Sequence, residues 1–216
     1  MHALAGLADD APTRDLRQTC IDVLCAYLRL PYTAEADLPQ SGADARHAYL
    51  ALREVRHTVI RLIRDHLRLE PEHSHSWQGH DLDFTGVVFD GGDLSGVVFS
   101  GGAVSFMNAE FSGGTLGFSS VSFMNARFSG GTVNFMGATF SGGRANFYGA
   151  VFDGGTVDFS HARFDGGTVD FSHAVFDGGM VDFSHALGDA PAGLVPSNGP
   201  LPAWLSLPPD WYPITP

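Results

Sequence analysis

The 216-residue chain contains no lysine, so all 12 of its basic residues are arginine. Against them stand 24 acidic residues, which gives a formal net charge of -12. The imbalance is greatest in residues 81–190, where 12 acidic residues face only Arg127, Arg144 and Arg163. An acidic surface repels phosphates, and we therefore expect no direct binding of nucleic acid.

Cysteine is also scarce. The two thiols, Cys20 and Cys25, lie five residues apart in a stretch with helical periodicity, which fits neither a disulfide framework nor a zinc motif. No apolar run approaches the roughly 20 residues that cross a bilayer, and no signal peptide is visible. We expect a cytoplasmic protein that has no membrane span and needs no metal or cofactor.

Phenylalanine, in contrast, is abundant and regularly placed. All 17 Phe residues lie between residues 82 and 185, each at the centre of a five-residue unit such as Val157-Asp158-Phe159-Ser160-His161. Two units followed by two inserted residues give a period of 12, which indicates a repeat architecture. A small aliphatic residue and Phe alternate with a variable residue, the period of a strand. The unit centres form the expected core: Phe84, Phe89, Leu94, Phe99, Phe106, Phe111, Phe118, Phe123, Phe128, Phe135, Phe140, Phe147, Phe152, Phe159, Phe164, Phe171, Phe176 and Phe183.

The units resemble a known repeat family. Ala162-Arg163-Phe164-Asp165-Gly166 and Gly92-Asp93-Leu94-Ser95-Gly96 are similar to pentapeptide repeats, whose central Leu or Phe follows a small residue by two positions. The resemblance implies a mainly β fold for residues 82–190, a right-handed quadrilateral β-helix with four units per coil. The inserted pairs would lengthen most coils to about 24 residues, which is two periods of 12.

Residues 1–70 precede the repeats and show helical periodicity. We expect helices over about 13–30 and 43–69, the second with an apolar seam at Leu52, Val55, Val59, Leu62 and His66. The arginines of the second helix are either a basic docking surface or a solvated face. Residues 17–29 and 55–58, with Trp77, resemble the helical segment of actinobacterial pentapeptide-repeat proteins. Such relatives often carry membrane helices upstream, but none is visible in this chain, so we expect no membrane role.

Two segments lack repeats. Residues 71–81 are polar and predict a linker, with Trp77 packed over the first coil. Residues 191–216 hold eight of the 12 prolines, yet also Leu205, Trp204 and Trp211. Proline prevents extension of a sheet, and an open solenoid end needs a cap, so we expect part of this tail to cover the last coil. An exposed Pro-rich ligand segment is the alternative.

The Asp-Phe-Ser-His units contain the residue types of hydrolytic and metal sites. Asp158 and His161 recur 24 residues later as Asp182 and His185, which predicts columns of like side chains on one face. Adjacent outward positions on a flat coil supply no pocket or oxyanion hole, however. We therefore expect that the protein is not an enzyme. We interpret the motif as a polar outer surface that was copied when the repeat was duplicated.

The acidic residues are the remaining candidate for function. The outward carboxylates of the later repeats form a possible interaction surface: Asp153, Asp158, Asp165, Asp170, Asp177 and Asp182. Our preferred hypothesis is a non-enzymatic scaffold that binds an unknown protein partner, as a monomer or a homodimer. The alternative is a DNA mimic that binds a type II topoisomerase such as gyrase, because some pentapeptide-repeat proteins present an acidic rod to such enzymes.

Overall fold

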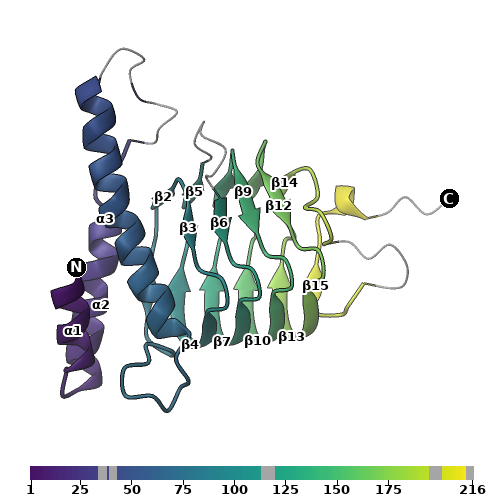
Figure 1. The fold of residues 1–216 in the computed structure, drawn as a ribbon. Coiled ribbons are helices and arrows are strands. Elements are labelled where there is room, and N and C mark those ends of the chain that lie inside the picture. Colours follow the sequence, from purple (N-terminus) through teal and green to yellow (C-terminus); the bar gives the residue numbers. More distant parts are fainter. Residues whose placement is uncertain (34–37, 39–42, 113–119, 195–200, 213–216) are drawn as a thin grey trace.

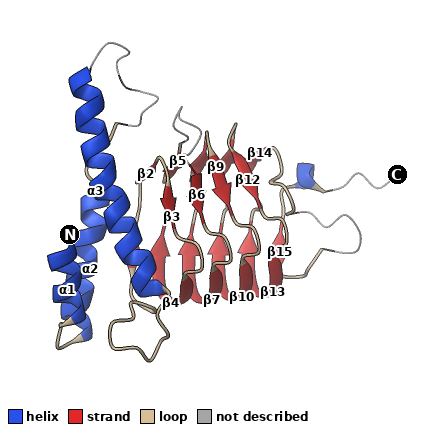
Figure 2. Cartoon of the chain, viewed as in Figure 1, coloured by secondary structure: helices blue, strands red, loops and turns tan. Residues whose placement is uncertain are grey.

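The computed structural model describes residues 1–33, 38, 43–112, 120–194 and 201–212. Three helices stand at one end of a parallel β-solenoid, and the strands follow one another away from them toward the C-terminal tail (Figure 1). The three α-helices precede the strands along the chain, and a short 3-10 helix, η2 (Pro209–Trp211), follows them (Figure 2). The mainly β solenoid expected from the repeats is confirmed.

Parallel pairing stacks the strands into three sheets. The first comprises β1 (Leu82–Asp83), β4 (Val98–Ser105), β7 (Arg127–Asn134), β10 (Val151–Asp158), β13 (Val175–Asp182) and β15 (Leu205–Ser206). The second comprises β2 (Val88–Phe89), β5 (Glu110–Phe111), β8 (Thr139–Phe140), β11 (Arg163–Phe164) and β14 (Leu187–Gly188). The third comprises β3 (Gly92–Asp93), β6 (Ser120–Ser122), β9 (Arg144–Asn146) and β12 (Thr168–Asp170). Each eight-residue strand of the first sheet, namely β4, β7, β10 and β13, contains a glycine pair in its middle. The residues before this pair form the fourth side of a coil.

The register gives the length of each coil. Val133, Val157 and Val181 pair in succession, which makes these coils 24 residues long, as the period of 12 predicts. Val104 pairs with Val133, however, so the coil between them has 29 residues, one pentapeptide more than four sides need. Its third side is taken by Val121, which pairs with Gly92. The unit around Phe118, expected in the core, lies outside the described residues.

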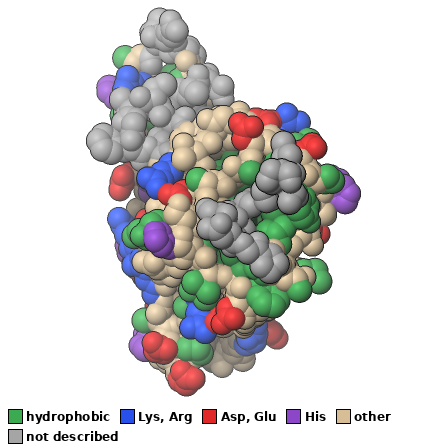
Figure 3. All heavy atoms as spheres, turned by 90° about the vertical axis from the view of Figure 1, so that its right-hand side faces the viewer, with side chains coloured by type: hydrophobic (Ala, Val, Ile, Leu, Met, Phe, Trp, Pro, Cys, Tyr) green, Lys and Arg blue, Asp and Glu red, His purple; other side chains and the backbone are tan. Residues whose placement is uncertain are grey.

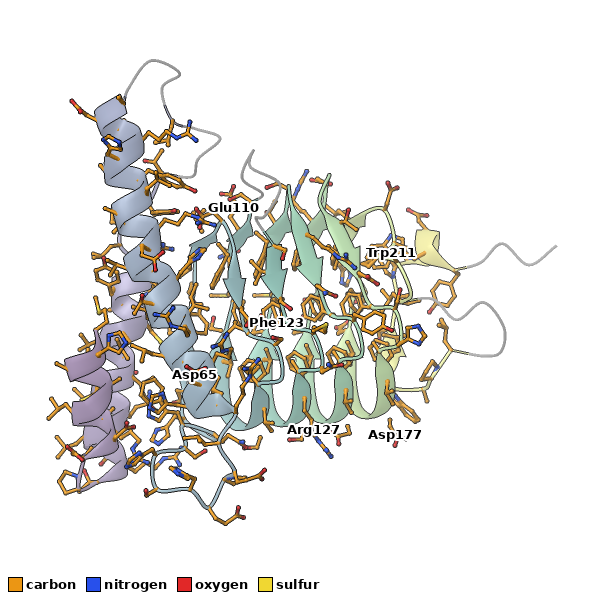
Figure 4. The ribbon with its side chains drawn as sticks, in the orientation of Figure 1. Asp65, Glu110, Phe123, Arg127, Asp177 and Trp211 are labelled. Atoms are coloured by element: carbon orange, nitrogen blue, oxygen red, sulfur yellow. The ribbon has the colours of Figure 1, made fainter. Side chains whose placement is uncertain are left out.

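The interior is filled by columns of phenylalanine. In the first column, Phe106, Phe135, Phe159 and Phe183 stack with ring centroids 4.5 to 4.6 Å apart and planes within 5° of parallel. That separation is close to the spacing of neighbouring strands, so one ring fits each coil without displacing the backbone. Figure 4 shows Phe123 inside the solenoid. Of the unit centres that the structure describes, all are buried except Phe176, which is partly exposed on the last coil.

The helices are α1 (His2–Asp9), α2 (Arg14–Leu28) and α3 (Ala43–Leu67). Thr13 caps α2 by accepting the Leu16 N–H. The expected helices at about 13–30 and 43–69 differ from α2 and α3 by at most two residues at either end. The apolar seam predicted for α3 is correct only in part, since Val59 is buried and Leu62 is partly buried but Val55 is exposed. The buried face is wider and comprises Tyr49, Arg56, Val59, Ile60, Ile63 and Leu67, because α3 packs on the first coil as well as on α2.

Residues 71–81 form a packed turn between α3 and the first coil. Trp77 has no exposed surface, and its ring stacks on that of His66 at 4.0 Å. Ser76 and His80 are also buried. The first half of the predicted linker, residues 71–75, is exposed, whereas its second half packs against the rest of the protein.

The tail lies against the last coil. β15 pairs in parallel with β13, and Leu205 and Leu194 are buried. The Trp211 ring lies 5.5 Å from that of Phe164 and 5.8 Å from that of Phe183, and its Nε1 donates to the Gly188 carbonyl. Trp211 thus covers the end of two phenylalanine columns.

Two glycines in the solenoid should lose different amounts of stability when they are mutated to alanine. Gly86 and Gly155 both have φ near +70°, but a Cβ on Gly155 would lie 2.5 Å from the Gly131 carbonyl oxygen, whereas a Cβ on Gly86 meets nothing. We expect Gly86→Ala to lower the free energy of unfolding by about 1–2 kcal/mol. Gly155→Ala should lower it by about 2–4 kcal/mol, because the backbone must also shift. Urea unfolding of both variants checks this, and equal losses would contradict it.

Candidate functional site

The aspartate of each Asp-Phe-Ser-His unit binds the backbone of its own corner. Asp158 accepts the N–H of Ser160 at 2.7 Å, and Asp182 accepts that of Ser184 at 2.7 Å. The same position in earlier coils is filled by residues with the same bond: Asp83, Ser105 and Asn134 on this side, and Asp93, Ser122, Asn146 and Asp170 on the opposite side. This bond closes a turn. The first role of these aspartates is therefore to stabilise the turns of the solenoid.

Arginine neutralises part of the acidic surface. Asp153 pairs with Arg127, and Asp165 pairs with the Arg163 Nη2 at 2.5 Å. Figure 4 shows Arg127 and Asp177 on the outer edge of the solenoid. Asp177 is exposed, whereas Asp158 and Asp182 are half-buried.

Asp170 is the exception to the predicted interaction surface. It is buried, pairs with Arg144, and accepts the N–H of Ser172 at 2.8 Å. Burial opposes its ionisation, but these two contacts prevail and lower the pKa of Asp170. It is covered because Ala192 of the tail bridges to it from above. In this structure Asp170 cannot contribute to an outward surface.

The histidines of the same units occupy the left-handed corner position. His161 and His173 have φ of 58° and 59°, where other coils place Gly or Asn. His161 stacks on His185 at 4.9 Å, as their separation of 24 residues predicts. The Ser184 hydroxyl lies 3.0 Å from His185 Nδ1, but Asp182 binds the backbone rather than the imidazole. A Ser-His-Asp relay is therefore not assembled here.

Some arginines of α3 face the solenoid, which neither interpretation of the sequence foresaw, whereas Arg61 is exposed and donates to the Thr58 hydroxyl. Arg56 is buried and donates to the carbonyls of Leu28 (2.6 Å) and Val88 (2.8 Å). Arg64 pairs with Asp93 of β3. Arg29 and Arg68 make comparable contacts, with Asp83 and Ser95. These side chains join the helices to the first coil, so for them both the basic docking surface and the solvated face are wrong.

The most densely contacted polar group is Asp90, just after β2. Its carboxylate is buried and accepts hydrogen bonds from the phenols of Tyr32 (2.5 Å) and Tyr49 (2.6 Å). The Arg53 Nε lies 3.4 Å from one carboxylate oxygen, and the His57 Nε2 lies 3.6 Å from the other. Four side chains from the helical segment thus converge on one carboxylate of the solenoid.

These contacts shift the protonation of the cluster. Burial by itself would raise the pKa of Asp90, but His57, Tyr32 and Tyr49 outweigh it and lower the pKa to about 2. Burial and the hydrogen bond to Asp90 raise the pKa of both tyrosines. An ionised Asp90 held by two protonated phenols is suited to joining two parts of a chain. A general base, in contrast, needs a pKa near the working pH.

The last coil differs from the others in its outward side chains. Thr156 is followed in register by Met180, and Arg163 by Leu187. Met180 is 57% exposed and Leu187 is 53% exposed. Other exposed apolar side chains of this end are Val175, Trp204 and Tyr212. Figure 3, which looks onto this end, shows hydrophobic side chains gathered there with acidic groups at the edge.

Comparison with known families agrees with this geometry. Residues 142–187 match the model of pentapeptide repeats (9 copies). The chain therefore contains pentapeptide repeats. Among curated proteins and among solved structures, none matches the chain.

Two further observations concern the part of the chain that the structure describes. None of the described helices combines the length and the apolar character needed to cross a membrane. Within the described ranges, no three His, Cys, Asp or Glu side chains come together in a way that could hold a metal ion.

The Asp90 cluster and the apolar last coil escaped the sequence analysis. Asp90 occupies a position that is Ser or Asp in equivalent units, such as Ser100 and Asp153, so nothing in the repeat marks it. Its partners come from residues 32–57, and only the docking of the helices brings them near. The apolar last coil had a visible signal, because Met180 and Leu187 break a run of polar residues in their columns.

The low pKa of Asp90 predicts a pH-dependent loss of stability. Its folded pKa, about 2, lies below the ordinary value of 3.8, so its contribution is complete above about pH 4 and disappears as the pH falls toward 2. We expect Asp90→Asn to reduce the free energy of unfolding at pH 7 by roughly 2 kcal/mol. The difference from the original protein should shrink at pH 2.

Urea unfolding between pH 2 and pH 7 measures this difference. Asp177→Asn is the matched control, because Asp177 is exposed on the last coil, and it should change little at any pH. A constant difference between Asp90→Asn and the original protein across the range would contradict the assignment.

Proposed function

We propose that this pentapeptide-repeat protein is a non-enzymatic interaction protein that binds a protein partner through its C-terminal coil. One observation carries the proposal: outward positions that are Thr or Arg in the preceding coil become Met180 and Leu187 in the last one. An exposed apolar patch with a polar rim is typical of a protein-binding surface. A cytoplasmic location belongs to the same proposal, and the free thiols Cys20 and Cys25 support it.

The chemistry of the partner follows from the rim. Asp177 and Asp189 are exposed on the last repeats, close in sequence to the apolar side chains. We infer a partner with an apolar surface bordered by Arg or Lys, because opposite charges steer association and favour the correct orientation.

The outward columns along the sides support a structural role rather than catalysis. Asp158 and Asp182 hold corners through their bonds to Ser160 and Ser184. A hydrolytic or general-base role requires a carboxylate oriented toward a histidine or a substrate. The contacts of these side chains favour the interaction proposal over an enzyme.

The DNA-mimic alternative gains no support from the acidic side chains. Asp153, Asp165 and Asp170 are paired with arginine, which cancels half of the six charges that a mimic would use. The solenoid is also short, since six stacked strands on its longest sheet span roughly 24 Å at 4.8 Å per step. We therefore favour a protein surface other than the DNA site of a topoisomerase.

A capture experiment with two matched variants tests the proposal. Immobilised protein is incubated with lysate of its source, and bound proteins are quantified by mass spectrometry. We expect a specific partner whose yield falls at least about tenfold, or about 1.4 kcal/mol, with Met180→Asp plus Leu187→Asp. Met124→Asp, at a methionine exposed on a side of the solenoid, should retain it. No specific partner, or equal loss with both variants, would contradict the proposal.

A supercoiling assay tests the alternative. Because arginine neutralises half of the six carboxylates and the solenoid is short, we expect an excess of the protein to leave DNA gyrase fully active, while a competing DNA duplex inhibits it. Inhibition by the protein that disappears with Asp158→Asn plus Asp182→Asn would instead favour the mimic.

A further inference from the structure

The helix α2 is apolar on two opposite faces. Ile21, Leu24 and Leu28 are buried against the rest of the protein. On the opposite face Leu16 and Val23 are each 51% exposed, and Leu30, two residues beyond the helix, is 55% exposed. A helix that only covers the solenoid needs one apolar face. The second apolar face is therefore unexplained by the fold.

The exposed side chains follow the pattern of a helix-pairing seam. Leu16, Val23 and Leu30 are seven residues apart, and Thr19 and Ala26 lie between them at a step of three. All five are exposed, and we call them the α2 stripe. The Leu30 N–H still bonds to the Tyr27 carbonyl, so the helical course continues to the end of the stripe. Alternating steps of three and four are the seam of two packed helices.

A hollow beside the α2 stripe can receive a side chain. The cavity of ≈ 250 Å³ lies between α1 and α2 and is lined mainly by apolar groups, among them Leu7, Pro12, Leu16 and Cys20. Leu7 itself is 61% exposed. The volume exceeds that of a leucine side chain, and helix pairs place such side chains into hollows of this kind. Figure 2 shows α1 and α2 at the end of the molecule opposite the last coil, and the residues of the stripe are exposed there.

We propose that the α2 stripe pairs with the α2 stripe of a second copy, in antiparallel orientation about a two-fold axis at Val23. Leu16 and Leu30 are equally distant from Val23, so the axis places Leu16 of one copy opposite Leu30 of the other. A two-fold interface requires such self-complementarity. Antiparallel helices also bring opposite ends of their dipoles together.

The charges beside the stripe select this orientation. Asp15 and Arg29 each precede a leucine of the stripe by one residue, at its two ends. Antiparallel pairing brings Asp15 to the same end and the same side of the interface as Arg29 of the second copy, whereas parallel pairing leaves these two side chains at opposite ends of the stripe. Arg29 already contacts Asp83, but its guanidinium has five N–H donors and can bind a second carboxylate. Asp22, near the axis, accepts a hydrogen bond from Gln18 at 2.8 Å.

The molar mass of the full chain in solution tests the dimer. We expect sedimentation or light scattering to show the mass rising from 23.0 kDa toward twice that value between about 1 and 100 µM. Val23→Asp places charges at the axis and should hold the protein at 23.0 kDa with an unchanged circular dichroism spectrum. Val175→Asp, at a valine of similar exposure on the last coil, should leave the dimer intact. A monomer throughout, or a dimer lost only with Val175→Asp, would overturn the proposal.

Disulfide trapping tests the orientation without relying on a destabilised variant. Single variants Leu16→Cys and Leu30→Cys are mixed and mildly oxidised, and the native Cys20 and Cys25 are buried. Antiparallel pairing should link Leu16→Cys to Leu30→Cys in excess over either variant linked to itself. Predominant self-linkage would contradict it, as would a cross-link to a different protein when the oxidation is repeated in lysate.

Discussion

The stacking of phenylalanine rings at the spacing of parallel strands is the interaction on which this solenoid depends. Rings such as Phe135 and Phe159 lie 4.5 Å apart with planes within 5° of parallel. Because that distance matches the distance between strands, each coil can repeat the one below it without strain. The columns also define the register. The coil between Val104 and Val133 contains one extra unit, yet the pairing of Gly92 with Val121 keeps Phe123 in its column.

A column of rings must end somewhere, and the two ends of this molecule are closed differently. At the first coil, buried Arg56 and the phenols that bind Asp90 fasten the helices over the solenoid. At the last coil, Leu205 and Trp211 of the proline-rich tail continue the apolar columns. An uncovered end would expose strand edges and aromatic rings to other chains. Closure with residues that do not repeat also makes the two ends chemically distinct.

The proposed functions use exposed side chains that do not stabilise the fold. Aspartates such as Asp158 hold the corners, while Asp153 is paired with Arg127, so much of the acidic skin belongs to the solenoid itself. Four exposed apolar side chains have no such structural role: Met180 and Leu187 on the last coil, and Leu16 and Val23 on α2. The two proposals use these two surfaces, and the roughly five coils between them keep the surfaces apart.

The sequence by itself determined the solenoid, its 24-residue coil and its phenylalanine core. The reason is that the same five-residue pattern recurs many times, and each copy forms the same short strand and turn. The helices expected from the sequence over about 13–30 and 43–69 also lie within two residues of α2 and α3 at each end. Only the tertiary structure decided which face of α3 is buried, where its arginines point, and that Asp90 gathers Tyr32 and Tyr49. These contacts join segments that occur once, over 41 and 58 residues of sequence. Periodicity can show that a side chain faces inward, but a contact between non-repeating segments depends on how they dock.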